Sequence, residues 1–447
     1  MTRRLTDPRT VPIGPPHAPA ARPVRWPWIV ASLLATALGG WWASETFGER
    51  EPFVVGILHS RSGPTAPQER SLIDAEVLAL EEINRNGGLL GRRVRWVIAD
   101  GGADGTSFAR QAERLIRDDR ADVLVGCWSA TSRRAVVSVV EANDHLLMHP
   151  HRHEGFEESR HVVSMGPLPN QLIAPAVAWC RETMSASRFF MVGTDDPWSR
   201  SAGAFLGDQL TGIDASLVGE EYLASGSLDM AGIVAAISTS SPDVVFSLMG
   251  GESTAALLRQ LREAGVRPAD LPVMIFSVNE DELRGMPADD VTGNYVIAGS
   301  FPGNDRAAAE AFVRSFRTRY GDDRPASEQA MAAHGAVRLW AEAVKGAGTA
   351  DVTIVRSMIR HQTLPSPEGV IAVDPENRHA WRSLSVGRIR PDGQIDTLWA
   401  TRGPTRPTPF PATRSRADWN KFAVSIQREK APRRSAAPSD PRPGITP

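Results

Sequence analysis

The chain has 447 residues, of which 42% are hydrophobic and 23% are charged, a composition typical of globular proteins. Single cores stop growing beyond about 250–300 residues, so two or more folding units are expected. The formal net charge is −2, and the two cysteines, Cys127 and Cys180, lack a metal-binding spacing. This composition gives no reason to expect a nucleic acid partner, and we expect no metal, no cofactor and two buried free thiols.

The N-terminal residues favour a membrane anchor. Residues 1–25 are rich in Pro and Arg and predict a disordered cytoplasmic segment, whereas residues 26–43 form an uncharged run with Trp at both ends. Arginines precede this run and glutamates follow it, so the positive-inside rule places the rest of the chain in the periplasm. The alternative is a secretory signal cleaved near residues 35–37, which would release a periplasmic protein.

Strand and helix patterns alternate from Glu51 onward. The first series predicts strands at 53–58, 94–98, 123–126 and 146–148 and helices at 71–86, 108–117 and 133–142. The second series predicts strands at 188–193, 216–222, 243–248, 273–276 and 295–298 and helices at 201–210, 230–238 and 254–264. Two long helices follow at 307–320 and 328–347. The expected fold class is α/β, with two lobes that are each a mainly parallel sheet flanked by helices.

Polar residues follow two consecutive strands of the first series. The strand at 123–126 is followed by Trp128 and Ser129, and the strand at 146–148 is followed by a loop with His149, His151 and Arg152. In open parallel sheets the carboxyl ends of the strands border the crevice where ligands bind. These two loops therefore predict a small-molecule site.

Several fragments, taken together and in order, resemble a known family. They include Val54-Val55-Gly56-Ile57-Leu58-His59-Ser60, Glu81-Glu82-Ile83-Asn84, Gly126-Cys127-Trp128, Pro169-Asn170-Gln171 and Phe276-Ser277-Val278. From about Pro52 to Trp419 the chain resembles the type I periplasmic binding proteins of the urea and short-chain amide branch. The resemblance implies two lobes that close over a small polar solute, without catalysis, and an ABC permease as partner.

The resemblance also sets expected boundaries. The two-lobed domain would comprise residues 52–425, with the first lobe at 52–168 and 299–347 and the second lobe at 169–298 and 348–402. Residues 426–447 are rich in Pro, Arg and Ser, and this composition predicts a disordered tail. The candidate ligand-binding residues, from the strand ends and the resemblance together, are Trp128, Ser129, Ala130, His149, His151, Arg152, Asp195, Asp196, Trp198, Gly250, Glu252 and Glu280.

Some of these residues depart from the family pattern. Ala130 stands at a serine position, His149 and Asp196 stand at tyrosine positions, and Gly250 stands at an asparagine position. A site without the hydroxyl groups that hydrogen-bond a buried amide selects amides less strongly over other solutes. Imidazole and guanidinium groups suit an acidic or larger polar solute. The departures therefore favour a solute with acceptor groups, such as a carboxylate, over urea itself.

Three other functions were weighed against solute binding. A metal site could use the alternating His149, His151 and His153, but the cationic Arg152 among them disfavours it. A hydrolase built on Ser129 has no supporting motif. A sensing role, with a membrane kinase or regulator as partner, remains open beside transport.

We predict that the segment Trp28 to Ala43 remains attached to the mature protein, because the charge asymmetry favours an anchor and no good cleavage site is present. N-terminal sequencing of the protein purified from membranes should therefore recover residues upstream of Leu38. A mature chain that starts near Leu38 and occurs in the soluble fraction would contradict the anchor.

Overall fold

The computed structural model describes residues 51–63, 65–278, 282–283, 285–299, 301, 307–322, 324, 326–367 and 369–428. The predicted anchor at 26–43 lies outside these residues, as does the tail beyond residue 428. Among the helices that are described, none is both long and apolar enough to cross a membrane. Cys127 and Cys180 are both buried and free.

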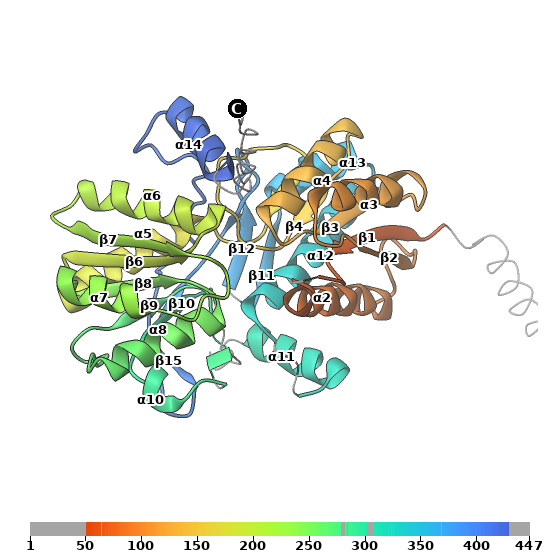
Figure 1. The fold of residues 1–447 in the computed structure, drawn as a ribbon. Helices are drawn as coiled ribbons and strands as arrows, with labels where there is room; N and C mark the ends of the chain where they lie inside the picture. The colour runs from red at the N-terminus through yellow and green to blue at the C-terminus, as the bar shows by residue number, and fades with distance from the viewer. Residues whose placement is uncertain are drawn as a thin grey trace, which may run out of the picture. The chain divides into compact units, whose positions relative to one another are not determined.

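The first lobe is built around a five-stranded sheet with the order β2-β1-β3-β4-β5, in which every pair is parallel (Figure 1). Its elements are β1 (Phe53–His59), α2 (Ala66–Arg85), β2 (Val94–Asp100), α3 (Gly105–Arg117), β3 (Val123–Gly126), α4 (Ala130–Ala142), β4 (Leu147–His149) and β5 (Val162–Ser164). This order is that of a doubly wound sheet, as the alternating pattern predicts.

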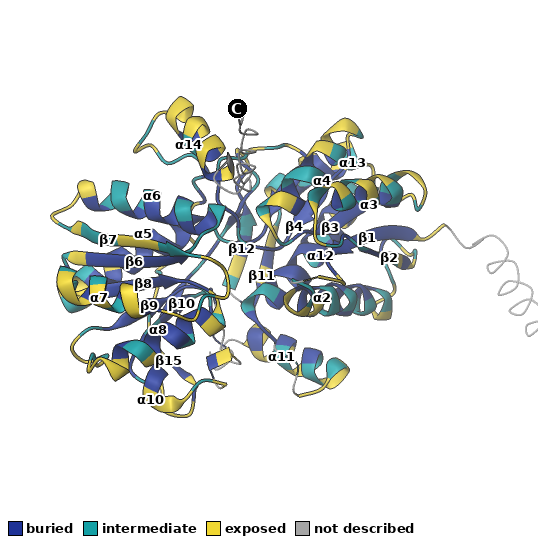
Figure 2. Cartoon of the chain, in the orientation of Figure 1, coloured by how far each residue is buried: buried dark blue, intermediate teal, exposed yellow. Residues whose placement is uncertain are grey.

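Helices cover both faces of this sheet, because successive side chains of each strand point to opposite faces. In β1, Val54 and Leu58 pack with α3 and α4, whereas Val55 and Ile57 pack with α2 and the later helix α12 (Glu328–Ala347). Burial on both faces explains why the strand reads as a continuous apolar run. Figure 2 shows the buried strands between partly exposed helices.

The second lobe contains a seven-stranded sheet with the order β15-β14-β10-β9-β8-β6-β7. It is parallel from β7 to β10, and β14 and β15 are antiparallel additions. Its elements are α5 (Pro169–Met184), β6 (Arg188–Thr194), α6 (Pro197–Thr211), β7 (Ser216–Leu223), α7 (Ala231–Ser240), β8 (Val244–Leu248), α8 (Gly251–Glu263), β9 (Val273–Ile275), α10 (Ala288–Val291), β10 (Tyr295–Ala298), β14 (Ser385–Ile389) and β15 (Ile395–Ala400).

After β10 the chain returns to the first lobe and stays there longer than predicted. The returning elements are α11 (Ala307–Tyr320), α12, α13 (Val352–Met358), the short 3-10 helix η1 (Ile359–His361), β11 (Thr363–Ser366), β12 (Gly369–Val373) and β13 (Ala380–Trp381). Val355, Leu364 and Ile371 belong to the same core as α12 and β1. The boundary predicted at residue 348 is therefore wrong, because these apolar side chains are buried against the first sheet and only β14 and β15 join the second.

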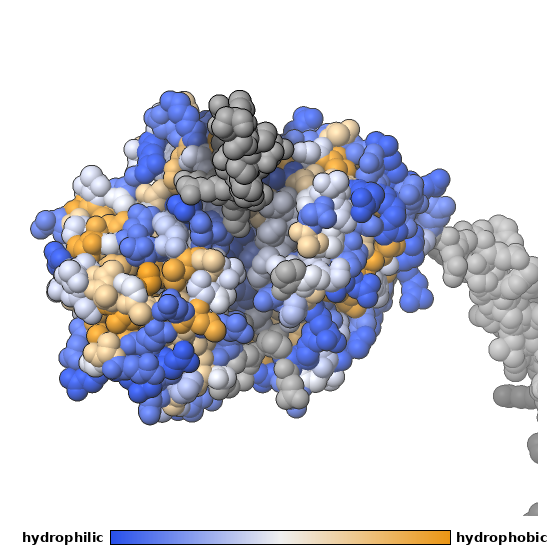
Figure 3. Space-filling model, in the orientation of Figure 1, coloured by the Kyte–Doolittle hydropathy of each residue, from blue (hydrophilic) through white to orange (hydrophobic). Residues whose placement is uncertain are grey.

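Most of the predicted elements are present within a few residues of their expected ends. Several helices begin earlier than their apolar stripes suggest: α2 begins at Ala66 and α6 at Pro197. Helix α5 and the helix α14 (Arg416–Arg428), which overlaps the predicted tail, were not predicted. The visible surface is largely hydrophilic, with apolar side chains in scattered patches (Figure 3).

The packing of α12 predicts the effect of one core substitution. Trp340 is 1% exposed and lies in the core that joins α12 to the first sheet. Trp340→Ala should destabilise the protein by about 3–5 kcal/mol, because a large apolar side chain is lost and a cavity remains. Chemical denaturation measures this loss. The control Leu398→Ala, at a side chain that is 52% exposed, should change stability by less than about 0.5 kcal/mol.

Candidate functional site

The carboxyl ends of β3 and β4 place two rings face to face. Trp128 follows β3 and His151 follows β4, and their ring centroids are 3.7 Å apart with an interplanar angle of 14°. Gly126 permits this close geometry: its φ is +145°, and a Cβ there would lie 2.1 Å from the carbonyl oxygen of Leu58. The two loops predicted from the sequence to share an edge therefore do so, and they form an aromatic wall.

Arg152 extends from this wall to the second lobe. Its Nη1 donates a hydrogen bond of 2.6 Å to Ser277 Oγ, just after β9, and its guanidinium carbon lies 4.1 Å from the ring centroid of Trp198 in α6. Burial lowers the pKa of Arg152, and the carboxylates of Asp196, Glu328 and Glu282 act in the opposite direction from longer range. Among the described residues, no carboxylate forms an ion pair with this guanidinium.

A cavity lies beside Arg152, where the two lobes and the segments that join them meet. It encloses about 370 Å³ of empty space, part of it open to solvent. Its lining residues are Pro150, His151, Arg152, Gly166, Pro167, Leu172, Phe276, Glu328, Gln329, Ala332 and Arg382. The Arg382 guanidinium forms an ion pair of 2.9 Å with Glu328 and donates to the carbonyl oxygen of Met165. Among the described residues that line the cavity, Arg152 is therefore the guanidinium without an ion-pair partner.

The histidines of the loop after β4 are buried and uncharged. Burial lowers the pKa of His149 to about 3, with the positive charge of Arg133 adding to the effect, and also lowers the pKa values of His151 and His153. These imidazoles therefore bring no positive charge to an acidic solute. Desolvation disfavours the charged form of a buried imidazole, and no carboxylate contacts these three rings in the described part of the chain.

His153 belongs to a buried hydrogen-bonded chain instead of the cavity. Its Nδ1 accepts from the backbone N–H of Gly155, so its Nε2 carries the proton and donates to His379 Nε2 at 2.8 Å. Nδ1 of His379 then donates to the carbonyl oxygen of Asn377. Burial lowers the pKa of His379 to about 4, so both rings are neutral at pH 7.

A buried ion network holds the end of the same loop. Glu154 accepts from both Nη atoms of Arg133, at 3.1 and 3.2 Å, and also pairs with Arg134. Although burial favours the neutral acid, the charges of Arg133 and Arg134 keep the pKa of Glu154 below its usual value. Because both arginines project from α4, this network fixes the loop to the first lobe.

A second buried cluster lies at the end of β1. His59 is placed between two carboxylates, with Nδ1 2.9 Å from Glu69 and Nε2 3.0 Å from Glu76. Burial opposes protonation of His59, but the two carboxylates outweigh it and raise its pKa to about 10. Glu69 also accepts the backbone N–H of Ser60. This cluster ties the end of β1 to α2, and it was not among the predicted site residues.

The other predicted residues lie elsewhere or have structural partners. Asp196 caps α6 by accepting the Ser199 N–H at 2.8 Å, and Asp195 pairs with Arg200 at 2.7 Å. Ser129 caps α4 and Ala130 begins it. Gly250 precedes α8 and Glu252 is exposed in its first turn, and neither lines the cavity. Glu280 lies outside the described residues.

The structure adds cavity residues that no local pattern indicated. Ser277 and Phe276 lie within a fragment used for the resemblance, but Arg382, Glu328 and Leu172 come from distant segments. The predicted residues that the structure does bring together are Trp128, His151, Arg152 and Trp198.

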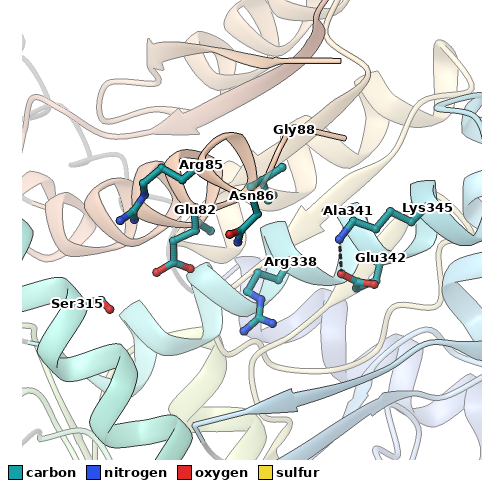
Figure 4. A pocket seen from close by; sticks show the side chains of 11 residues that line it. Glu82, Arg85, Asn86, Gly88, Ser315, Arg338, Ala341, Glu342 and Lys345 are labelled. Carbon is teal, nitrogen blue, oxygen red and sulfur yellow. Dashed lines mark hydrogen bonds and ion pairs between the residues drawn. The ribbon is translucent and has the colours of Figure 1, made fainter. Parts of the chain in front are cut away.

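A separate groove lies on the flank of the first lobe. Glu82 and Arg85 of α2, and Asn86 directly after it, face Arg338 and Lys345 of α12 (Figure 4). Both of its carboxylates have partners, because Glu82 pairs with His334 at 2.8 Å and Glu342 pairs with Lys345 at 2.9 Å. The groove is distant from the strand ends in the fold, so it is not the candidate site.

Comparisons with known proteins agree with this architecture. Residues 53–416 match the family described as periplasmic binding protein domain. A solute-binding protein of an ABC transporter from Rhodopseudomonas palustris, in complex with p-hydroxybenzoic acid, has a TM-score of 0.72 and 17% identity, covering 79% of this chain and 98% of its own. The branched-chain amino acid binding protein LivJ from Streptococcus pneumoniae, in complex with isoleucine, has a TM-score of 0.67 and 17% identity, covering 80% and 100%.

A curated protein matches a shorter stretch. A limonene hydroxylase from Geobacillus stearothermophilus is 26% identical over 118 residues, which are 26% of this chain. The matched stretch spans 22% of that protein's length.

The likeness to the solved structures establishes the two-lobed type I periplasmic binding fold.

The buried neutral histidines predict how stability depends on pH. In the unfolded chain a histidine binds a proton near pH 6.5, whereas folded His149 does so only near pH 3. Below pH 6.5 the unfolded state therefore binds more protons than the folded state. As the pH is lowered from 6.5 toward 3, the contribution of His149 should decrease the free energy of unfolding by up to about 1.4 kcal/mol per pH unit.

His149→Asn should reduce this acid dependence, because Asn can still donate to the carbonyl oxygen of Gly126, as His149 Nδ1 does at 3.1 Å. Chemical denaturation between pH 7 and pH 4.5 measures the slope. The control His361→Asn, at an exposed residue, should keep the slope of the unchanged protein. Equal slopes in all three proteins would contradict a buried neutral His149.

Proposed function

The chain belongs to the periplasmic binding protein family, and from this premise we propose that its two lobes close over a small solute that carries a carboxylate. It is a binding protein and not an enzyme. The hydrolase alternative has no support at Ser129, whose Oγ caps α4 through the Ser132 N–H at 3.1 Å. The observation that supports a carboxylate is the guanidinium of Arg152 at the cavity.

Arg152 combines three properties of an anion-binding residue. It lines the cavity, it has no ion-pair partner among the described residues, and its position is fixed from both sides by Ser277 and Trp198. A desolvated guanidinium gains most from a carboxylate, because the pair can form two parallel charge-assisted hydrogen bonds. A solute with a carboxylate would therefore supply the negative charge that the site lacks.

The walls of the cavity favour a solute with an apolar or planar body. Phe276 and Leu172 line it from the second lobe, and His151, backed by the ring of Trp128, lines it from the first. Two structural neighbours are described with p-hydroxybenzoic acid and isoleucine, which both combine a carboxylate with an apolar body. Such compounds are the first candidates.

Urea or a short-chain amide is the alternative solute, implied by the sequence resemblance. These compounds are neutral and would leave the Arg152 charge without a counterion, so the geometry favours them less. The electrostatics of the cavity thus favour a carboxylate over a neutral amide, whereas Ala130 and Gly250 do not line the cavity and have no part in this choice.

The proposed biological role is delivery of the solute to an ABC permease in the periplasm. The Rhodopseudomonas palustris neighbour is described as a solute-binding protein of an ABC transporter and LivJ as the substrate-binding protein of a branched-chain amino acid transporter, and the family is periplasmic by name. An N-terminal anchor would hold the protein at the inner membrane beside its permease. Sensing through a membrane kinase or regulator is the alternative role, and the genes that neighbour this one would discriminate between them.

We expect a thermal-shift screen to separate the solute classes. Benzoate, 4-hydroxybenzoate and isoleucine are the carboxylate probes, and urea and acetamide are the neutral ones. A probe that binds the folded state stabilises it by about 2.7 kcal/mol at a hundredfold excess over Kd. Stabilisation by urea or acetamide, with none by a carboxylate, would contradict the proposed ligand class.

Calorimetry with the best carboxylate then tests the role of Arg152. Arg152→Gln should weaken binding about 10- to 150-fold, because a charge-assisted hydrogen bond of roughly 1.5–3 kcal/mol is lost. The control Arg110→Gln removes an exposed arginine of α3 and should leave affinity unchanged. Affinity should also be constant between pH 6 and 8, because the charge belongs to a guanidinium and the neighbouring histidines are neutral.

A further inference from the structure

The C-terminal segment contacts both lobes outside the connections that join them. We call residues 404–428 the C-terminal strap; it leaves β15, runs as an extended segment and ends in α14. The family match ends at residue 416, so nearly all of α14 lies beyond it. In Figure 1, α14 lies next to α6.

The first part of the strap is bound to the segments that pass between the lobes. The backbone of Thr405 pairs with that of Arg382, with N–O distances of 2.7 and 3.3 Å. Gln171 at the start of α5 donates to the Thr405 carbonyl oxygen at 2.9 Å. Asn170 donates to the carbonyl oxygen of Arg406 and accepts the N–H of Thr408, both at 2.9 Å. The strap thus runs beside the hinge.

The second part of the strap is bound to the second lobe. Arg414 forms two hydrogen bonds of 2.7 Å with the carboxylate of Asp208 on α6. Thr413 donates to the same carboxylate at 2.9 Å. A two-point guanidinium–carboxylate pair fixes orientation as well as distance, so the start of α14 is held on α6.

The same helix is also bound to the ligand loop of the first lobe. The ring of Phe156 stacks on Trp419, with centroids 5.1 Å apart and an interplanar angle of 24°. Trp419 is 1% exposed, and the Phe156 N–H donates to the carbonyl oxygen of Pro409 at 3.0 Å. Arg416 pairs with Glu158 at 2.7 Å. Phe156 lies four residues after Arg152, on the loop whose Glu154 is fixed to α4.

We propose that the C-terminal strap is a latch that favours the closed arrangement of the lobes and positions the ligand loop. Separating the lobes would require the Phe156–Trp419 contact to break, or α14 to leave Asp208. Weakening the strap should therefore raise the open population, and a solute that binds the closed state would then bind less tightly. Only this consequence for affinity rests on the proposed function.

Distances between the lobes test the latch without any ligand. Spin labels at Ala103→Cys, after β2, and Ser225→Cys, after β7, mark the strand ends that border the crevice; both positions are exposed, and the native Cys127 and Cys180 are buried. Pulsed electron paramagnetic resonance on the full chain should show a longer-distance population in Trp419→Ala that the parent protein lacks. Trp419→Phe, which keeps a ring for stacking, should restore most of the parent distribution.

Two further variants separate the latch from a loss of folding. Phe156→Ala removes the other ring of the same contact, so it should change the distances as Trp419→Ala does. The double variant should show no larger open population than either single variant. The control Trp399→Ala removes a half-buried tryptophan of the second lobe outside the strap and should leave the distances unchanged. Thermal denaturation should first show that the parent, Trp419→Ala and Phe156→Ala proteins are all folded. Identical distance distributions in these three folded proteins would overturn the latch. These distances are measured without a ligand. Failure of every carboxylate probe to bind would therefore contradict the proposed ligand class and leave the test of the latch unchanged.

Discussion

The parallel order of the strands in both sheets is the constraint on which the site depends. In a parallel sheet every strand ends at the same edge, so the loops after β3 and β4 must lie side by side. Trp128 and His151 meet there as stacked rings, and Arg152 follows directly and reaches Ser277 after β9. The second sheet contributes Phe276 after β9, and the cavity lies where these loops meet the segments that join the lobes. Neither lobe alone contains a complete site.

Desolvation decides which of the polar groups in this region can bind an anion. His149 ends β4, and His151 and His153 follow it, but burial keeps all three neutral, whereas a guanidinium remains charged even when burial lowers its pKa. The other arginine of the cavity, Arg382, is already paired with Glu328. The cationic character of the site thus depends on one side chain, which is why substituting it should have a large effect.

The loop that carries Arg152 is held by different kinds of interaction on its two sides. Before Arg152, the loop is fixed by the aromatic stack and by the short strand β4. After it, Glu154 is bound by Arg133 and Arg134, and Phe156 is bound by Trp419 of the C-terminal strap. Breaking a buried ion pair is costly, so the Arg133 contact ties the loop firmly to the first lobe. The contact with Trp419 ties it to the second lobe.

The sequence by itself determined the local elements and the polar ends of the strands. Apolar periodicity predicted the strands and most helices, and the residues after β3 and β4 indicated Trp128, His151 and Arg152, because these features depend on neighbours within one or two turns. Only the tertiary structure decided that 352–381 packs on the first lobe, that His149 is neutral, that Ser277 accepts from Arg152, and that Arg382 lines the cavity. These properties depend on burial and on contacts between residues more than a hundred positions apart, which no local pattern records.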